Sequence, residues 1–305
     1  MSRISVARLP PDGRRLHLQD GPIDLVVEAS GSQGEVEAAY GAAIETFDGL
    51  LDSLCRELPL LRRPVTARSP GPEGAVAKRM HAAVAPFASQ AFITPMAAVA
   101  GSVADAVLEA MLRTSDLHRA YVNNGGDIAF HIGAGETLRL GLVDRPDRPG
   151  LFGRAVLQAA DAVRGAATSG WRGRSFSLGI ADAVTVLAQS AAEADAAATV
   201  IANAVDLPGH RRVKRVPADS IQPDSDLGPR LVTRAVGPLT AGEIADALGS
   251  GLACAEGLMA RGLVAGAALH VQGVTRLAGQ SARPQLEAAM PIRASGRELL
   301  VECNP

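Results

Sequence analysis

The hydrophobic positions near the start of the chain alternate with polar ones and then take up helical spacing. Residues 4–9 and 15–19 predict a hairpin, and residues 23–29 predict a third strand. Over residues 34–58 apolar side chains recur every three or four positions, which predicts one long amphipathic helix ended by Pro59. The prolines of residues 62–74 predict a loop, and a shorter helix is expected at 74–85.

Further along, helical segments and short strands interleave. Helices are predicted at residues 92–113, 191–205 and 241–261, and strands at 128–132, 137–143, 181–188, 264–272 and 274–278. We find no internal repeat and no break in composition. The pattern therefore predicts a single α+β domain over residues 1–280, with helices packed on a mostly antiparallel sheet, and a C-terminal tail at 281–305.

The composition argues against some classes of binding partner. Hydrophobic residues make up 47% of the 305 residues and charged residues 20%, as in a globular protein. A formal net charge of -2 and only 3% aromatic residues argue against a nucleic-acid partner. We find neither an unbroken apolar run of membrane-spanning length nor the apolar core of a signal peptide. The sequence therefore predicts a cytoplasmic protein without a membrane partner; a homo-oligomer is compatible with it.

The three cysteines of the sequence, Cys55, Cys254 and Cys303, are far apart and odd in number. Their spacing matches neither a disulfide framework nor a zinc site. We therefore expect no structural disulfide.

A short polar turn between two strands is the first candidate for chemistry. Asn123, Asn124, Gly125 and Gly126 can adopt positive φ and bring bare backbone close to a ligand, and Asp127 then adds a carboxylate. The alternative is a plain β-hairpin, because Asn-Gly is also the strongest short hairpin signal.

A second candidate turn contains two hydroxyl groups and two cations. Thr168, Ser169 and Gly170 precede Arg172 and Arg174, and together these groups suit phosphate oxygens. A polar turn between strands with solvated arginines is an equal alternative.

The helix at 191–205 supplies a candidate metal site. Ser190 suits its N-cap, with Glu193 three residues later. Asp195 and Thr199 are four residues apart, so their oxygens share one helical face. Such a pair suits Mg²⁺, which takes few protein ligands and completes its shell with water and phosphate. The alternative is an aspartate facing water and a threonine bonded to its own helix.

Small residues mark the segment 97–104, which permits close approach by either a ligand or a neighbouring helix. Asp105 and Glu109 follow four residues apart and predict a solvated helical face.

Three of these segments, in this order, resemble the ApbE superfamily of FAD:protein FMN transferases. Residues 122–128 (V-N-N-G-G-D-I), 167–170 (A-T-S-G) and 195–199 (D-A-A-A-T) are similar to its motifs. Residues 93–105 are similar to its segment V-D-L-x-A-I-x-K-G-Y-x-x-D, with Gly101 and Asp105 in register. The whole chain most resembles the UPF0280 branch.

The resemblance implies a T-fold-like, helix-on-sheet architecture in which a flavin dinucleotide lies in a cleft with its phosphates near Mg²⁺. Carried over residue by residue, it implies flavin-nucleotide contacts at Asn124, Gly125, Gly126, Asp127, Thr168, Ser169 and Gly170. It implies metal contacts at Asp195, Thr199 and the backbone carbonyl of Ala97.

The chain also departs from the transferase pattern. Ala100 stands in place of a lysine, and Thr94 in place of an aspartate that contacts the nucleotide. Residues 177–182 replace the stretch H-x-x-D-P-x-T-G, and we expect no leader of the kind common among the transferases.

These departures favour a cytosolic protein that binds a flavin nucleotide such as FAD, another nucleotide or another small substrate beside a Mg²⁺ site. The alternative is a Mg²⁺-dependent FAD:protein FMN transferase that modifies a protein threonine. A purely structural role gives no reason for the turns to cluster.

Overall fold

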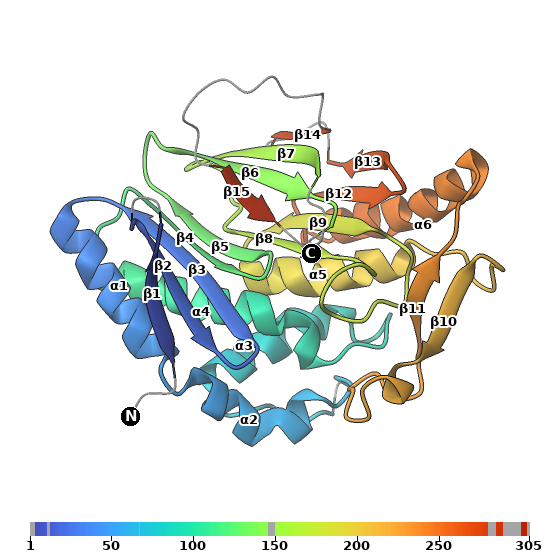
Figure 1. The fold of residues 1–305 in the computed structure, drawn as a ribbon, viewed down its shortest axis with the longest axis horizontal. Coiled ribbons are helices and arrows are strands. Elements are labelled where there is room, and N and C mark those ends of the chain that lie inside the picture. The colour runs from blue at the N-terminus through green and yellow to red at the C-terminus, as the bar shows by residue number, and fades with distance from the viewer. Residues whose placement is uncertain are drawn as a thin grey trace.

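The computed structural model describes residues 4–10, 13–66, 68–145, 150–279, 285–288 and 300–303 (Figure 1). Its elements are, in order, β1 (Ser5–Leu9), β2 (Arg15–Asp20), β3 (Ile23–Ser30), α1 (Gln33–Phe47), α2 (Leu50–Leu61), α3 (Ala75–Val84), η1 (Ala85–Phe87), η2 (Pro95–Ala98), α4 (Val99–Thr114), β4 (Arg119–Asn124), β5 (Asp127–Ile132), β6 (Thr137–Val143), β7 (Leu151–Gln158), β8 (Gly165–Ser169), β9 (Ala183–Ala188), α5 (Ala191–Ala204), β10 (Val213–Pro217), η3 (Ala218–Ser220), β11 (Leu231–Val236), α6 (Ala241–Ala260), β12 (Gly266–Val271), β13 (Val274–Ala278), β14 (Gln285–Ala288) and β15 (Leu300–Cys303).

One large antiparallel sheet carries the fold. Its strand order is β1-β2-β3-β4-β5-β8-β9-β12-β13, and every neighbouring pair is antiparallel. A second sheet has the order β14-β7-β6-β15, and β10 pairs with β11 in a separate ribbon. This confirms the α+β prediction with helices packed on a mostly antiparallel sheet.

The large sheet is covered on both faces from β4 to β12. Side chains of β2, β3 and β4 pack with α1, α2, α3 and α4 in one apolar cluster, and α5 and α6 pack on β9 and β12 in another. The opposite face packs against β6 and β7 (Figure 1). Strands buried on both faces read as continuous apolar runs, and β9 and β12 are buried at every position.

The middle of the large sheet has a narrow junction. Strand β5 meets β8 through only two registered pairs, Ile128 with Ala166 and Ala129 with Gly165. The neighbouring pairs β4–β5 and β8–β9 are longer. We call this junction the seam; it joins the half formed by β1–β5 to the half formed by β8, β9, β12 and β13.

The single helix predicted over residues 34–58 is wrong. The structure has two helices, because Gly49 takes a left-handed conformation with φ of 75° between α1 and α2. Pro59 lies inside α2 and does not end it. Burial of Leu54 and Leu61 on either side of the proline offsets the hydrogen bond that it removes.

Helices α4 and α5 approach each other too closely for ordinary side chains. A Cβ added to Gly101 of α4 would lie 2.2 Å from the carbonyl oxygen of Ala191, and one added to Gly165 of β8 would lie 2.1 Å from the nitrogen of Ala191. Within the segment 97–104, Gly101 therefore serves helix packing.

The segment Pro95–Thr114 is long and apolar enough to cross a membrane, with mean hydropathy of 1.4. It is 61% buried inside the fold, however, where it packs against α1, α3 and α5. That burial is typical of the core helix of a soluble protein.

Residues 281–305 are described in part. Strand β14 pairs antiparallel with β7, and β15 pairs parallel with β6, so two pieces of the expected tail join the second sheet. The remaining residues of that segment lie outside the described residues. The division into one domain and a tail stays a prediction.

Candidate functional site

The Asn-Gly-Gly-Asp turn is a two-residue β-hairpin between β4 and β5. Asn124 pairs with Asp127, which leaves Gly125 and Gly126 as the turn, with φ of 64° and 111°. The carboxamide oxygen of Asn123 accepts a hydrogen bond from the Gly126 N–H at 2.8 Å. Positive φ is thus confined to the glycines, and both asparagines keep strand geometry. The plain-hairpin alternative describes this backbone correctly.

The side chains beside the turn tie it to neighbouring elements. The buried Asn124 donates from Nδ2 to the carbonyl oxygen of Ala100 at 3.1 Å, which joins the hairpin to the first turn of α4. Asp127 accepts from the Thr168 N–H at 3.3 Å, across the seam. The hairpin therefore touches α4 and β8 at once.

Asp195 reaches from α5 to the N-terminus of α4. Its Oδ2 accepts from the Gly101 N–H at 3.0 Å, and the Ala100 N–H also bonds the carboxylate. Ser190 caps α5 as predicted, since its hydroxyl accepts from the Glu193 N–H at 3.2 Å. Thr199 lies one turn beyond Asp195 and is partly exposed.

Asp105 of α4 in turn binds the N-terminus of α5. Its two carboxylate oxygens accept from the N–H groups of Ala191 and Ala192, at 3.0 and 2.9 Å, at the start of α5. The side chain is buried, so the predicted solvated face at Asp105 is wrong; Glu109, one turn on, is exposed. Spacing within one helix could not show an acceptor for a helix 86 residues away.

Burial and charge perturb the carboxylates of this site. Burial, with a smaller contribution from the charge of Asp105, raises the pKa of Asp195 to about 7, although the Gly101 and Ala100 N–H groups oppose the shift. Burial and then the charge of Asp195 hold the pKa of Asp127 well above its usual range. The charge of Asp195 thus acts on Asp127, and two neighbouring carboxylates of this kind favour retention of a proton or binding of a cation near neutral pH.

The Thr-Ser-Gly segment is not a free turn. Thr168 and Ser169 are the last two residues of β8, and the Thr168 hydroxyl shares a hydrogen bond of 2.8 Å with the Thr185 hydroxyl on β9. Gly170 follows, where a Cβ would lie 2.3 Å from the carbonyl oxygen of Asp182. Of these groups, the backbone N–H of Thr168 reaches the carboxylate pair.

The two predicted arginines have different surroundings. Arg172 pairs with buried Asp182 at 2.7 Å and stacks on Trp171, with its guanidinium carbon 4.4 Å from the ring centroid. Arg174 is exposed, and its Nη1 lies 3.2 Å from where a Cβ of Gly125 would be. Arg174 is therefore the cation that lies over the hairpin turn.

Asp182 accepts hydrogen bonds from several parts of the chain, which the sequence did not indicate. Besides Arg172, it accepts from the Trp171 indole N–H at 3.1 Å and from the Gln272 N–H at 2.6 Å. These bonds fix the loop after β8 against β12. In the sequence, Asp182 stands out only as part of the stretch that replaces a family motif, and its partners lie up to 90 residues away.

Asp226 is a second residue that sequence reasoning missed. Its Oδ2 accepts from the hydroxyl of buried Thr94 at 2.5 Å, across 132 residues. The Thr94 carbonyl accepts from the Ala97 N–H at 3.1 Å within η2. The loop that follows η3 therefore helps to fix the turn that carries Ala97.

The structure places the predicted residues in three regions. Asn124, Asp127, Asp195 and the N–H of Thr168 meet where β5, β8, α4 and α5 converge. Thr199 and Ala97 lie on the adjoining turn of α5 and on η2, which packs against α5. Gly170 lies farther along, against Asp182.

Comparison with known proteins gives a family. The family model described as AbpE bacteria matches residues 7–277. The UPF0280 protein of Methanopyrus kandleri is 35% identical over 183 residues, which cover 59% of this chain and 69% of that protein. The UPF0280 protein of Methanosphaerula palustris is 34% identical over 183 residues, which cover 57% of this chain and 70% of that protein.

A solved structure is also similar. The apo form of the flavinyl transferase ApbE of Pseudomonas stutzeri matches 91% of this chain and 94% of its own, with 13% sequence identity and a TM-score of 0.40. The family assignment rests on the sequence matches, which span most of this chain and more than two thirds of each relative. The chain belongs to the UPF0280 family, within the ApbE superfamily.

Proposed function

We propose that this protein binds a flavin nucleotide such as FAD, or another nucleotide, in the cytoplasm, with Mg²⁺ beside the Asp127–Asp195 pair. The observation that carries the proposal is the approach of these two carboxylates at the junction of β5, β8, α4 and α5. Two repelling, partly buried carboxylates destabilise a fold, and a bound cation relieves that repulsion.

The donor set fits a hard cation. Asp195, the Thr199 hydroxyl and the Ala97 carbonyl would hold the ion, with Asp127 facing it. All of these are oxygen donors, which Mg²⁺ prefers, and their small number leaves positions for water and phosphate. Among the described residues no three His, Cys, Asp or Glu side chains gather as a denser metal cluster. When bound, the ion would neutralise charge on the phosphates.

The groups around the pair suit the phosphates of the nucleotide. Gly125 is exposed and Arg174 lies over it, so backbone and guanidinium groups face the same turn. Asn124, Gly126, Asp127, Thr168, Ser169 and Gly170 would line the rest of the phosphate side. Arg172 contributes less, because its charge is balanced by Asp182.

The second candidate function is FAD:protein FMN transfer to a threonine of an acceptor protein. The sequence motifs favour it, and the similar Pseudomonas stutzeri protein is described as a flavinyl transferase. In that reaction the threonine oxygen bonds the phosphorus of the FMN half, the pyrophosphate bond breaks and AMP leaves. Ala100 and Thr94 disfavour it here, because Ala100 offers no amine and the hydroxyl of Thr94 is bonded to Asp226.

Thermal shift with purified protein tests the binding proposal. FAD, FMN and ATP are added singly with and without Mg²⁺, and we expect at least one to raise the melting temperature in a Mg²⁺-dependent manner. No shift with any of the three contradicts nucleotide binding. AMP release from FAD and Mg²⁺, with and without an acceptor peptide, distinguishes transfer from binding alone.

A further inference from the structure

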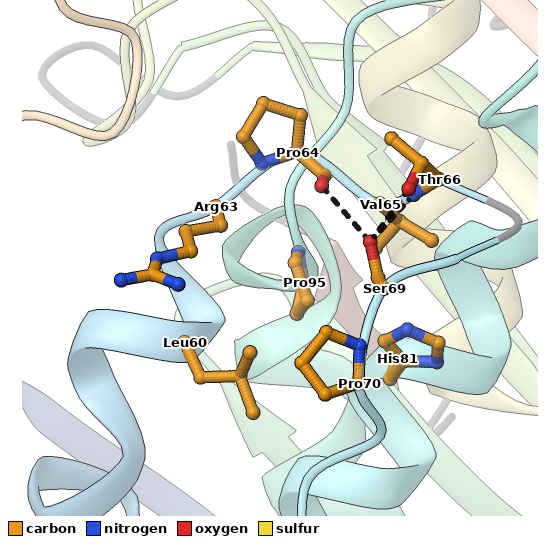
Figure 2. A pocket seen from close by; sticks show the side chains of 9 residues that line it. All are labelled: Leu60, Arg63, Pro64, Val65, Thr66, Ser69, Pro70, His81 and Pro95. Atoms are coloured by element: carbon orange, nitrogen blue, oxygen red, sulfur yellow. Dashed lines mark hydrogen bonds between the residues drawn. The ribbon is translucent and has the colours of Figure 1, made fainter.

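A cavity of about 310 Å³ lies between the end of α2, the connector after it, α3 and η2 (Figure 2). Its apolar lining comes from Leu60, Pro64, Val65, Pro70 and Pro95. Small-molecule pockets span about 300–1,000 Å³. The volume therefore suits one ring system and is too small for an entire dinucleotide.

The polar groups that line this cavity differ in whether they already have hydrogen-bond partners. Ser69 is satisfied, since its hydroxyl accepts from the Thr66 N–H at 2.8 Å and also bonds the Thr66 hydroxyl. The guanidinium of Arg63 points away from the cavity in Figure 2. The Nε2 atom of His81 is buried and has no hydrogen-bond partner among the described residues. A buried polar atom without a partner costs free energy, which a ligand can recover by bonding it.

Proline rings form much of the wall. The rings of Pro64, Pro70 and Pro95 surround the cavity together with the imidazole of His81 (Figure 2). Proline fixes its own backbone angle, so the wall loses little conformational freedom when a ligand enters. A planar heteroaromatic ring matches this lining, because its faces are apolar and its edge carries hydrogen-bonding nitrogens or oxygens. A phosphate would find no cation directed at it.

Helix η2 connects this cavity to the carboxylate site. Pro95 lines the cavity, and Ala97 is the residue whose carbonyl we place beside the metal. A 3-10 helix rises about 2.0 Å per residue, so the two residues are about 4 Å apart along its axis. The two ends of one nucleotide, ring and phosphate, are separated by a sugar and would lie on either side of this turn.

We propose that the cavity is the ring subsite of the nucleotide whose phosphates bind near Asp127 and Asp195. It receives a planar heteroaromatic ring, and His81 Nε2 hydrogen-bonds the edge of that ring. This assignment rests on the proposed function, and it adds the place of the ring and the group that recognises it.

Paired titrations with FAD and with pyrophosphate, each with Mg²⁺, test the assignment, because pyrophosphate has no ring. His81→Phe keeps a flat side chain and removes the nitrogen, so we expect FAD affinity to fall by about fivefold to tenfold, as for one lost hydrogen bond. Val65→Phe fills the cavity and should weaken FAD further. Neither change should alter pyrophosphate affinity. His118→Phe makes the same substitution at an exposed histidine outside the lining and should alter neither ligand.

Unchanged FAD affinity in both cavity variants overturns the assignment, as does an equal loss for FAD and pyrophosphate in variants that melt as the wild type does. If Val65→Phe does not fold, the comparison of His81→Phe with His81→Gln tests the assignment instead. The glutamine amide can donate a hydrogen bond, so His81→Gln should bind FAD more tightly than His81→Phe. If pyrophosphate does not bind the wild type, the phosphate site fails instead. Riboflavin and adenosine, which carry a ring without phosphate, then test the cavity: binding that His81→Phe weakens supports it, and no binding overturns it.

Discussion

Asp105 and Asp195 each accept hydrogen bonds from the N-terminus of the other's helix. Asp105 of α4 holds the first N–H groups of α5, and Asp195 of α5 holds N–H groups in the first turn of α4. Both helix ends thereby gain a carboxyl group as hydrogen-bond acceptor near the positive end of the helix dipole. The residue that we assign to the metal is thus also a structural acceptor, and this decides how it should be mutated.

Asp105→Ala should destabilise the protein by about 2–3 kcal/mol, because two buried N–H groups lose their acceptor. Urea denaturation measures the change. Glu109→Ala, one turn further along α4 and exposed, is the matched control and should cost less than about 1 kcal/mol. Equal effects of the two changes would show that Asp105 does not cap α5.

Asp195→Asn should weaken Mg²⁺-dependent nucleotide binding while keeping an oxygen that accepts the Gly101 N–H. Asp195→Ala should weaken binding as well. It also removes the acceptor for the N–H groups at the start of α4 and should therefore cost about 1 kcal/mol of stability. Thr199→Val should act in the same direction more mildly, because a neutral ligand is lost.

Mg²⁺ titrations in the presence of FAD compare the wild type with these variants. Curves identical to the wild type for Asp195→Asn and Thr199→Val would show that the D-A-A-A-T match is accidental.

Without divalent cations, stability should fall as pH rises from about 4 to about 7. In that window the raised pKa of Asp195, about 7, keeps its carboxyl protonated in the folded state while the unfolded chain has lost the proton. Folding therefore takes up a proton, and its contribution, fully present at lower pH, declines by about 2–4 kcal/mol. The raised pKa of Asp127 acts in the same direction.

Melting temperatures across this range, with EDTA and with Mg²⁺, measure the effect. Mg²⁺ should restore stability mainly at neutral pH, where protons compete least, and Asp195→Asn should flatten the profile. A metal-free profile that Asp195→Asn leaves unchanged would contradict the paired carboxylates.

Thr94→Val and Asp226→Ala should affect the protein through one shared contact. Each removes the hydrogen bond that fixes the start of η2, and Asp226→Ala also leaves the buried Thr94 hydroxyl without its partner, at about 1–3 kcal/mol. A double-mutant cycle should show a coupling of about 0.5–3 kcal/mol. Additive losses would mean that the contact does not join the loop to η2.

Gly101→Ala should disrupt the crossing of α4 and α5, because the new Cβ would meet the Ala191 backbone at 2.2 Å. We expect a loss of about 1–3 kcal/mol or more, the usual range for overpacking. Gly257→Ala in α6 is the matched control: no atom lies within 4 Å of its Cβ, and it should stabilise by about 0.5–1 kcal/mol. Similar stability of the two variants would exclude a tight crossing.

The sequence predicted most strands, the N-cap of α5 and the α+β class because these depend on local periodicity and local hydrogen bonds. It missed the break between α1 and α2, although Asp48-Gly49 is a turn dipeptide, because the apolar spacing continues on both sides. It also missed what Asp105, Asp182 and Asp226 do. Their most distant partners are 87 to 132 residues away, and no spacing along one element encodes such a distance.

The resemblance predicted one cleft for the motifs, but not which of their groups would lie against each other. The motifs indicated Asp127 and Asp195 separately, one for the cofactor and one for the metal. Their mutual repulsion follows from the crossing of α4 and α5 over the seam, which only the folded chain establishes.

The seam gives the site a mechanical consequence. Asp127 belongs to one half of the sheet, and α5, which carries Asp195, packs on the other half at β8. A cation held between Asp127 and Asp195 would oppose transient opening of the two registered residue pairs that join the halves of the sheet. Amide hydrogen exchange at Ala129 and Gly165 should then slow when Mg²⁺ and nucleotide are added, while exchange at the outer strands stays the same. Binding of the ligand would thus lower the rate at which the middle of the sheet opens.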